Sequence, residues 1–315
     1  MRSTPLPARP IAALAVVAAV TALALSSCRS TDAEAAPATA SSGVAAVAVA
    51  NRPAGWDDYW YAGEAEISTY DLTQNRYGED RDGDAVLVFV TEGFLPGAQV
   101  KDDGQPADEE AVSVLKLNRI HRFNTGIYDY SLMESVFTPV SRDRYPHTLK
   151  TTLSAQDWCG HSWFQLNRRG GAFEAERRSY FQAEADAKRR LSADLLEDEL
   201  ASLVRIDADL VPTGATRLIP GAMFSALYHV MPEPQDAVIG FRESAGERVL
   251  TVDYPGLDRQ LELRFAAAFP HEVLGWTETY KGQRLSAAEL RHTRKGAYWG
   301  QNATRFAPLR DSLGL

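Results

Sequence analysis

From Glu64 onward, the sequence is a succession of short apolar or alternating segments separated by turn-forming residues. Ala85–Val90 is a continuous apolar run with β-branched and aromatic residues, which is typical of a strand buried on both faces. Glu64–Tyr70 alternates instead, as a strand with one buried face does. A dozen such segments joined by short turns predict an antiparallel, mainly β domain rather than βαβ units. The other expected strands include Val112–Leu117, Ile127–Val140, Trp158–Leu166 and Ala222–His229.

Two short helices are expected beside the strands. Ser192 can cap a helix that runs to about Val204, because the leucines in between form one apolar stripe and Asp194 and Glu197 suit its positive end. Ser286–Glu289 reads as a capping box that opens a second helix. A long meander with an internal helix predicts a strongly curved antiparallel sheet, half-barrel-like, wrapped around that helix. At the level of the fold, this picture resembles the LolA-like half-barrel lipoproteins.

Three further features of the predicted domain have a structural interpretation. Asp82-Gly83 precedes an apolar strand and favours a hairpin turn. The cluster of Trp56, Tyr59, Trp60 and Tyr61 is expected to plug one end of the sheet, or else to line an apolar cavity. Acidic residues also occur two apart, and such pairs are either carboxylate dyads or solvated faces: Glu197 with Glu199, and Glu174 with Glu176.

The N-terminus has the features of an export signal. Arg2 and Arg9 precede an apolar run from Ile11 to Leu25, and Ser26-Ser27-Cys28 follows. The run has about 15 residues, too few for a spanning helix, which needs about 20. Leu25–Cys28 resembles the lipobox of bacterial lipoproteins, in which the cysteine receives diacylglycerol and becomes the new N-terminus. We therefore expect residues 1–27 to be a lipoprotein signal peptide and Cys28 to carry the lipid anchor.

Composition divides the rest of the chain into a tether and a folded part. Residues 28–54 are rich in Ala, Ser and Pro and predict a flexible tether, whereas residues 55–315 predict a single β-rich folded domain. Two halves meeting near Asp207–Gly214 are the alternative. Arg29, rather than Asp, follows the anchor and favours the outer membrane over the inner. The net charge of −9 argues against nucleic acid as a partner.

Trp158–Trp163 is the segment richest in reactive side chains. It contains Cys159, which has no intrachain partner once Cys28 is acylated, and His161. A buried strand is the leading interpretation, since free cysteine is often buried. A ligand or metal site and a nucleophile are the alternatives. His147 is expected opposite His161 across a turn at Ala155–Asp157, and would complete a three-ligand set with Cys159.

Several known site patterns are missing from the sequence. A calcium loop starting at Asp80 fails, because Ala85 and Thr91 stand where Gly and Glu are needed. The sequence has no CxxC, HExxH, glycine-rich phosphate loop, GxSxG or SxxK pattern. We therefore predict no cofactor and no established catalytic motif.

Six segments spread over most of the predicted domain carry a family resemblance: Arg76–Glu92, Val112–Asn118, Gly126–Val140, Pro146–His161, Leu195–Glu199 and Leu218–Gly221. They resemble an uncharacterised family of bacterial envelope lipoproteins, whose members often carry the label "septum formation inhibitor Maf". Maf proteins themselves are cytosolic nucleotide pyrophosphatases with a Ser-x-Ser-Pro-Arg-Arg motif, which this sequence lacks. The resemblance implies an envelope location and one domain, and it supplies no catalytic residue.

These features together favour a non-enzymatic, membrane-anchored envelope lipoprotein that binds an apolar ligand, such as a lipid, or an envelope protein on a curved sheet. The alternative is an envelope hydrolase or metal-dependent enzyme centred on Cys159, His161 and His147. A structural or assembly scaffold is the second alternative.

Overall fold

The computed structural model describes residues 52–193 and 195–315. The predicted signal peptide, the lipid anchor at Cys28 and most of the predicted tether lie outside these residues, as does Asp194 in the predicted first helix. Within the described ranges, no helix combines the length and the apolar character needed to cross a membrane.

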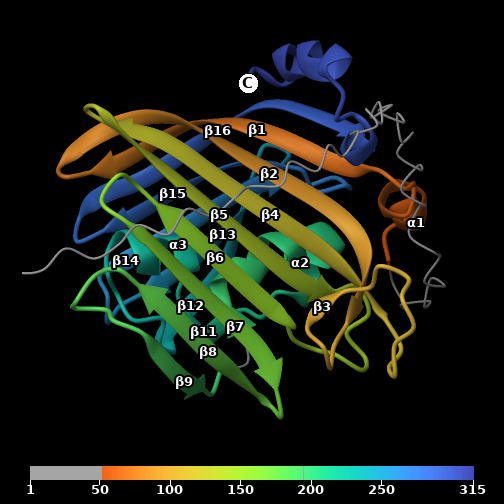
Figure 1. The fold of residues 1–315 in the computed structure, drawn as a ribbon, viewed down its shortest axis with the longest axis horizontal. Helices are drawn as coiled ribbons and strands as arrows, with labels where there is room; N and C mark the ends of the chain where they lie inside the picture. Colours follow the sequence, from red (N-terminus) through yellow and green to blue (C-terminus); the bar gives the residue numbers. More distant parts are fainter. Residues whose placement is uncertain (1–51, 194) are drawn as a thin grey trace, which may run out of the picture. The chain divides into compact units, whose positions relative to one another are not determined.

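One large antiparallel-dominated sheet contains every strand of the described residues, and it is not closed (Figure 1). The strands follow the order β10-β11-β12-β13-β14-β15-β16-β1-β2-β4-β5-β6-β7-β8-β9, with β3 paired to β2. Their bounds are β1 Ala65–Arg76, β2 Glu79–Leu95, β3 Val100–Lys101, β4 Val112–Thr125, β5 Tyr128–Pro139, β6 Lys150–Gln156, β7 His161–Arg169, β8 Ala172–Ser179, β9 Ala187–Leu191, β10 Leu195–Leu196, β11 Gly214–Ile219, β12 Gln235–Ser244, β13 Glu247–Tyr254, β14 Arg259–Ala266, β15 Val273–Tyr280 and β16 Gln283–Gly296.

The two edges of the sheet are neighbours in the sequence. β9 forms one edge and β10 the other, and only residues 192–194 separate them. β10 pairs in parallel with β11, whereas every other pair of strands is antiparallel. The middle of the sheet joins the first strand to the last, because β1 pairs with β16. The sheet therefore curves back on itself, as the predicted half-barrel requires.

The longest α-helix lies in the hollow of the curved sheet with a second short one (Figure 1). These are α2, Leu200–Asp207, and α3, Ala222–Leu227, and α2 continues a 3₁₀ turn, η1, at Glu197–Glu199. Residues 200–206 are all buried, and they join the side chains of the sheet in one hydrophobic core. The remaining helices are α1 Trp56–Trp60, η2 Ala208–Leu210, η3 Tyr298–Gly300 and η4 Thr304–Leu313.

Four hairpins close with two-residue turns in which both residues have positive φ: 77–78, 170–171, 245–246 and 281–282. This is the type I′ geometry, whose twist matches that of the paired strands. The predicted turn at Asp82-Gly83 is wrong, since Tyr77-Gly78 is the turn and Gly83 lies inside β2. A Cβ on Gly83 would lie 2.2 Å from the backbone oxygen of Arg122. Glycine at position 83 therefore allows β2 to lie close to β4, and it does not form a turn.

Both predicted helices need correction. The first begins in η1 rather than at Ser192, because Leu195 and Leu196 are extended and pair with β11. The predicted helix at Ser286 is wrong, since this residue lies in β16 and pairs with Glu278 of β15. The turn at 281–282 sets that pairing, which overrides the local capping pattern. Residues 222–227, predicted as a strand, form α3.

In the aromatic cluster predicted at the start of the domain, Trp56 and Trp60 are buried, whereas Tyr59 and Tyr61 are half-buried, and Trp60 lies beside a buried ion pair. Trp60 and Phe89 place their rings 5.0 and 5.1 Å from the guanidinium of Arg205. Arg205 is fully buried and donates a hydrogen bond to Glu66, which is 1% exposed. This salt bridge joins α2 to β1.

We expect the change Arg205→Met to reduce the free energy of unfolding by about 3–5 kcal/mol, because it leaves Glu66 as a buried charge without a counter-ion. Urea unfolding followed by tryptophan fluorescence measures the loss. The double variant R205M/E66Q carries neither charge and should recover most of it. Equal losses in the single and double variants would contradict the electrostatic explanation.

Candidate functional site

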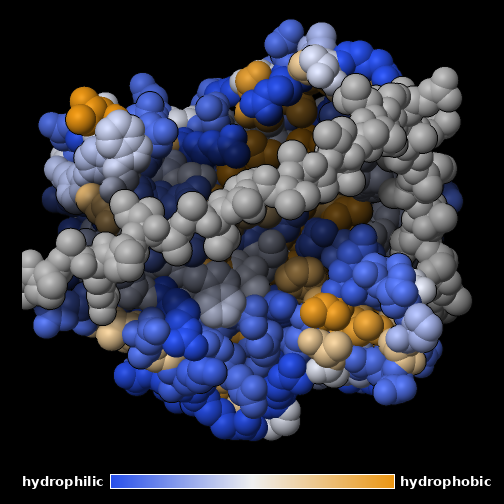
Figure 2. All heavy atoms as spheres, in the orientation of Figure 1, coloured by the Kyte–Doolittle hydropathy of each residue, from blue (hydrophilic) through white to orange (hydrophobic). Residues whose placement is uncertain are grey.

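A set of polar side chains faces the interior of the curved sheet, and all of them come from strands except Glu197 of η1 and Tyr228 at the end of α3. They line an interior cavity of about 60 Å³ together with apolar side chains from α2, α3 and the strands. A single water molecule needs about 10–15 Å³ of such free space, so the cavity has room for several waters or a small ligand. Figure 2 shows hydrophobic side chains at the bottom of a hollow with hydrophilic side chains around it. The polar side chains of the cavity wall are Gln74, Arg119, His121, Glu197, Tyr228, Arg259, Glu278 and Ser286.

One part of the wall is a hydrogen-bonded network in which one guanidinium is shared by two carboxyl groups. Arg259 donates to Glu197 at 2.6 Å and to Glu278 at 2.7 Å, and Tyr254 donates to Glu197 at 2.6 Å. Burial opposes the ionisation of Glu197, but the Arg259 guanidinium outweighs it and lowers the pKa of Glu197. The Arg259 guanidinium also lies 4.3 Å from the ring of Phe224 in α3. The N–H donors of Arg259 are thus used by Glu197 and Glu278, and the plane of its guanidinium packs on Phe224.

A second group contains two buried carboxyls. Glu134 is fully buried, and its nearest cation is Arg119, with 3.5 Å between the guanidinium nitrogen and the carboxylate oxygen. Asp198 accepts from the backbone N–H of Ala222 at 3.1 Å. Burial raises the pKa of Glu134, and burial together with the charge of Glu134 raises the pKa of Asp198 well above its usual range. The two carboxyls therefore favour a state that retains a proton.

His121 is the histidine of the cavity wall. It is 5% exposed and stacks on Trp276, with ring centroids 5.4 Å apart and planes 7° apart. Burial, aided by the charge of Arg119, lowers the pKa of His121 to about 3, so the ring is neutral at physiological pH. Within the described residues, its buried Nε2 atom has no hydrogen-bond partner.

The structure places Cys159 differently from the leading sequence interpretation. Trp158–Gly160 forms the turn between β6 and β7, and Cys159 is exposed, so the predicted buried strand is wrong at this residue. The carboxylate of Asp157 fixes the turn by accepting from the backbone N–H of Cys159 at 2.6 Å. His161 is the exposed first residue of β7, and its Nε2 lies 2.9 Å from the hydroxyl of Ser154.

His147 does not join this turn. Lys150 pairs with Asn167 and Gln156 pairs with His161, so His147 precedes the opposite end of β6. At about 3.4 Å per residue, the strand separates the two histidines by roughly 20 Å. The predicted set of Cys159, His161 and His147 is thus not assembled. Within residues 52–193 and 195–315, no group of three His, Cys, Asp or Glu side chains is arranged to hold a metal ion.

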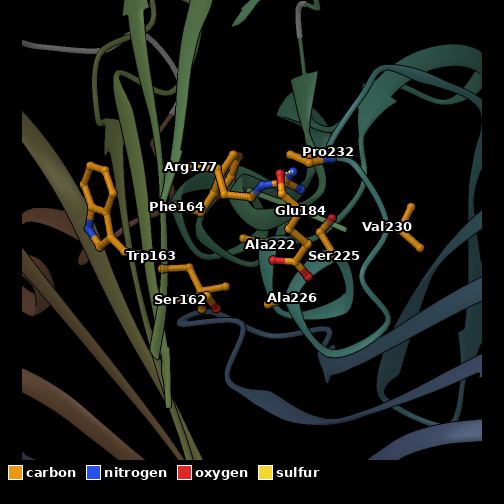
Figure 3. A pocket seen from close by; sticks show the side chains of 11 residues that line it. Ser162, Trp163, Phe164, Arg177, Glu184, Ala222, Ser225, Ala226, Val230 and Pro232 are labelled. Atoms are coloured by element: carbon orange, nitrogen blue, oxygen red, sulfur yellow. Dashed lines mark hydrogen bonds between the residues drawn. The ribbon is translucent and has the colours of Figure 1, made fainter. Parts of the chain in front are cut away.

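A second, smaller pocket of about 20 Å³ lies between α3 and the inner face of β7 and β8 (Figure 3). Glu184 lines it and bonds to His229 Nδ1, and the hydroxyl of Ser179 donates to Glu184 at 2.5 Å. Ser225 Oγ is buried and has no hydrogen-bond partner in the part of the chain that the structure describes. The serine–histidine bond that a nucleophilic mechanism uses is therefore missing. Trp163 points away from the other labelled residues in Figure 3.

The sequence contained a signal for the interior site that the sequence analysis did not use. In β4, Leu115, Leu117 and Phe123 are buried, and Arg119 and His121 occupy the same alternate positions. A charged residue at a position that the alternation assigns to the core is unusual unless it has a partner or a role. Glu134 in β5, Arg259 in β14 and Glu278 in β15 repeat this signal.

The comparisons with known proteins give no family. No protein-family model matches the sequence, and no curated protein matches it significantly. The resemblance to envelope lipoproteins therefore stays a prediction.

We expect the change Glu134→Gln to stabilise the protein progressively as the pH rises from 5 to 8. Because the pKa of Glu134 is raised by folding, wild-type stability falls as the pH rises from the unfolded pKa through the folded one. Glutamine removes that loss and keeps the shape of the side chain. Thermal unfolding of both proteins across this pH range measures the difference. Glu174→Gln, at a half-exposed surface carboxylate, is the control. A difference in melting temperature that does not change with pH would contradict the raised pKa.

Proposed function

We propose that this chain is a lipid-anchored protein of the bacterial cell envelope that binds a small ligand inside its half-barrel, without catalysing a reaction. The observation that carries the binding role is the interior cavity of about 60 Å³. Its wall combines apolar side chains with the buried Nε2 of His121, which has no hydrogen-bond partner among the residues that the structure describes. Cavities with a few convergent polar groups in an apolar wall are typical of ligand sites.

The proposed location depends on the N-terminal sequence. Acylation of Cys28 would anchor the chain stably, since more than one acyl chain exceeds the marginal hold of a single one. Arg29 favours the outer membrane over the inner. The likeness of a half-barrel to the LolA-like lipoproteins agrees with an envelope role, and it is an analogy of fold alone.

Binding of a partner protein is the second candidate, and exposed apolar side chains at neighbouring hairpin tips favour it. Ile127 is 84% exposed and Trp158 68% exposed, at the tips of the β4–β5 and β6–β7 hairpins. Tyr128 packs against Trp158, with ring centroids 6.5 Å apart, and Tyr77 of the β1–β2 turn bonds to Tyr130. The rival enzyme centred on Cys159, His161 and His147 receives no such support.

We expect the change Cys28→Ala to abolish acylation. A bacterial host fed with a palmitate analogue should label the wild-type chain and leave C28A unlabelled and released from the membrane fraction. The matched control is Cys159→Ala, which should label like the wild type, because this exposed cysteine follows no lipobox. Label that persists in C28A would contradict the proposed anchor.

We expect a co-purified small molecule on the exported C28A chain, purified without detergent and measured by native mass spectrometry. The added change Ala201→Leu should reduce its occupancy about tenfold or more, because Ala201 lines the interior cavity and the larger side chain fills it. Ala226→Leu is the matched control, since it fills the second pocket instead. A bare polypeptide mass, or equal occupancy in all three proteins, would contradict binding in the cavity.

A further inference from the structure

Two neighbouring side chains on β4 extend from the same face of the strand into the interior cavity. Arg119 and His121 are two residues apart, so they lie on one face, and both line the cavity. Arg122, on the same strand, is exposed on the opposite face. The cavity thus receives a guanidinium and an imidazole side by side.

Arg119 has donors that the described residues leave unused. A guanidinium has five N–H donors, and within the described ranges Arg119 makes no side-chain hydrogen bond and only one ion pair within 4 Å, with Glu134 at 3.5 Å. At that distance the pair is an ion pair without a good hydrogen bond. The side chain is 22% exposed, and part of its surface forms the cavity wall.

His121 contributes a second unused polar atom. Its Nε2 is buried, and no group in residues 52–193 or 195–315 bonds to it, which costs free energy unless a ligand or a water completes the bond. Because the ring is neutral, Nε2 carries a proton in one of its two tautomers and can then donate to an oxygen. An oxygen acceptor that meets both Arg119 and His121 would satisfy both residues.

The other charged groups around the cavity do not compete for the same ligand. Arg259 is committed to Glu197 and Glu278, so of the two arginines that line the cavity Arg119 is the one that makes no hydrogen bond within the described residues. Glu134 and Asp198 are not among the lining residues, and their raised pKa values reduce the negative charge that would repel an anion. The cavity wall at Arg119 therefore suits a single negative charge.

We propose that Arg119 and His121 form a carboxylate-binding site in the interior cavity, and that the ligand is a small monocarboxylate with a short apolar chain. Arginine binds carboxylates through two parallel N–H···O bonds, and His121 adds a third donor. The apolar chain contacts Leu87, Leu250 and Leu263, which line the same cavity. The cavity volume of about 60 Å³ sets the size class: a short-chain acid rather than a long fatty acid. This inference rests on the proposed binding function.

Isothermal titration of the detergent-free C28A chain with butyrate, in a buffer without other carboxylates, tests the site. We expect R119Q to bind butyrate about 10- to 100-fold more weakly, as the loss of a charge-assisted hydrogen bond predicts. R122Q, the matched control on the outer face of the strand, should bind like the wild type. Glu134→Gln removes the competing carboxyl and should bind at least as tightly as the wild type.

Loss of binding through unfolding is excluded by a second variant. The double variant R119Q/E134Q removes the buried carboxyl of Glu134 together with its cation, so it should keep the wild-type circular dichroism spectrum and still bind weakly. Tight butyrate binding by this folded double variant would overturn the carboxylate site.

Ligands of other chemistry distinguish the possible failures. Butanol that binds as tightly as butyrate, equally to wild type and R119Q, would keep the cavity as a binding site and overturn its carboxylate specificity. Laurate that binds where butyrate does not would overturn the small size of the ligand and indicate a lipid source. Absence of binding by all three, with a bare mass in native mass spectrometry, would overturn the proposed function as well.

Discussion

Three consecutive acidic residues in the hollow of the sheet are the constraint on which the fold depends. Glu197, Asp198 and Glu199 are all buried, and each must be neutralised or hydrogen-bonded there. Glu197 pairs with Arg259 of β14, whereas Glu199 accepts from the hydroxyl of Thr148, between β5 and β6, at 2.7 Å. β14 and β5 lie on opposite sides of β1 in the sheet. The acidic turn therefore joins the two arms of the half-barrel from within, and it fixes the start of α2 between them.

This arrangement also determines the chemistry of the cavity. An inner face of leucine and phenylalanine alone would leave Glu197 without a counter-ion, whereas Arg259 of β14 supplies one. Arg259 forms short hydrogen bonds to Glu197, whereas the guanidinium nitrogen of Arg119 lies 3.5 Å from the carboxylate oxygen of Glu134. The N–H donors of Arg259 are therefore used within the wall, whereas those of Arg119 are left for a ligand in the cavity. The cavity wall therefore contains both kinds of polar residue: Glu197 and Arg259, which bond to each other, and Arg119 and His121, which keep unused hydrogen-bonding atoms.

The sequence predicted the class of the fold well and the site poorly. Buried runs such as Ala85–Val90 and the alternation of β4 are local patterns, and each strand displays its own periodicity. The curved sheet followed from the number of strands and from the helix within them.

The predictions failed where pairing with a distant strand overrides a local pattern. Ser286 begins a capping-box pattern but lies in β16, because the adjacent turn directs it onto β15. Cys159 seemed the centre of chemistry because it is rare, yet it lies in an exposed turn. The convergence of Arg119, Glu197 and Arg259 depends on strands up to 140 residues apart, which no local window contains.

Stability favours polar residues on the inner face that are fully hydrogen-bonded, whereas ligand binding needs polar atoms that are left free. This difference separates the network of Glu197, Arg259 and Glu278 from the group of Arg119, Glu134 and His121. Replacing a buried ion pair by apolar side chains of similar volume is often neutral or stabilising. A pair as loosely matched as Arg119 and Glu134 therefore contributes little to folding, and the buried nitrogen of His121, which has no partner within the described residues, costs stability unless a ligand or a water bonds to it. The network of Glu197, Arg259 and Glu278 differs, because its hydrogen bonds repay the cost of burial. Side chains that cost stability and face an internal space are best explained by what enters that space. The free donors of β4 therefore locate the function of the protein more sharply than its deepest or most reactive residues do.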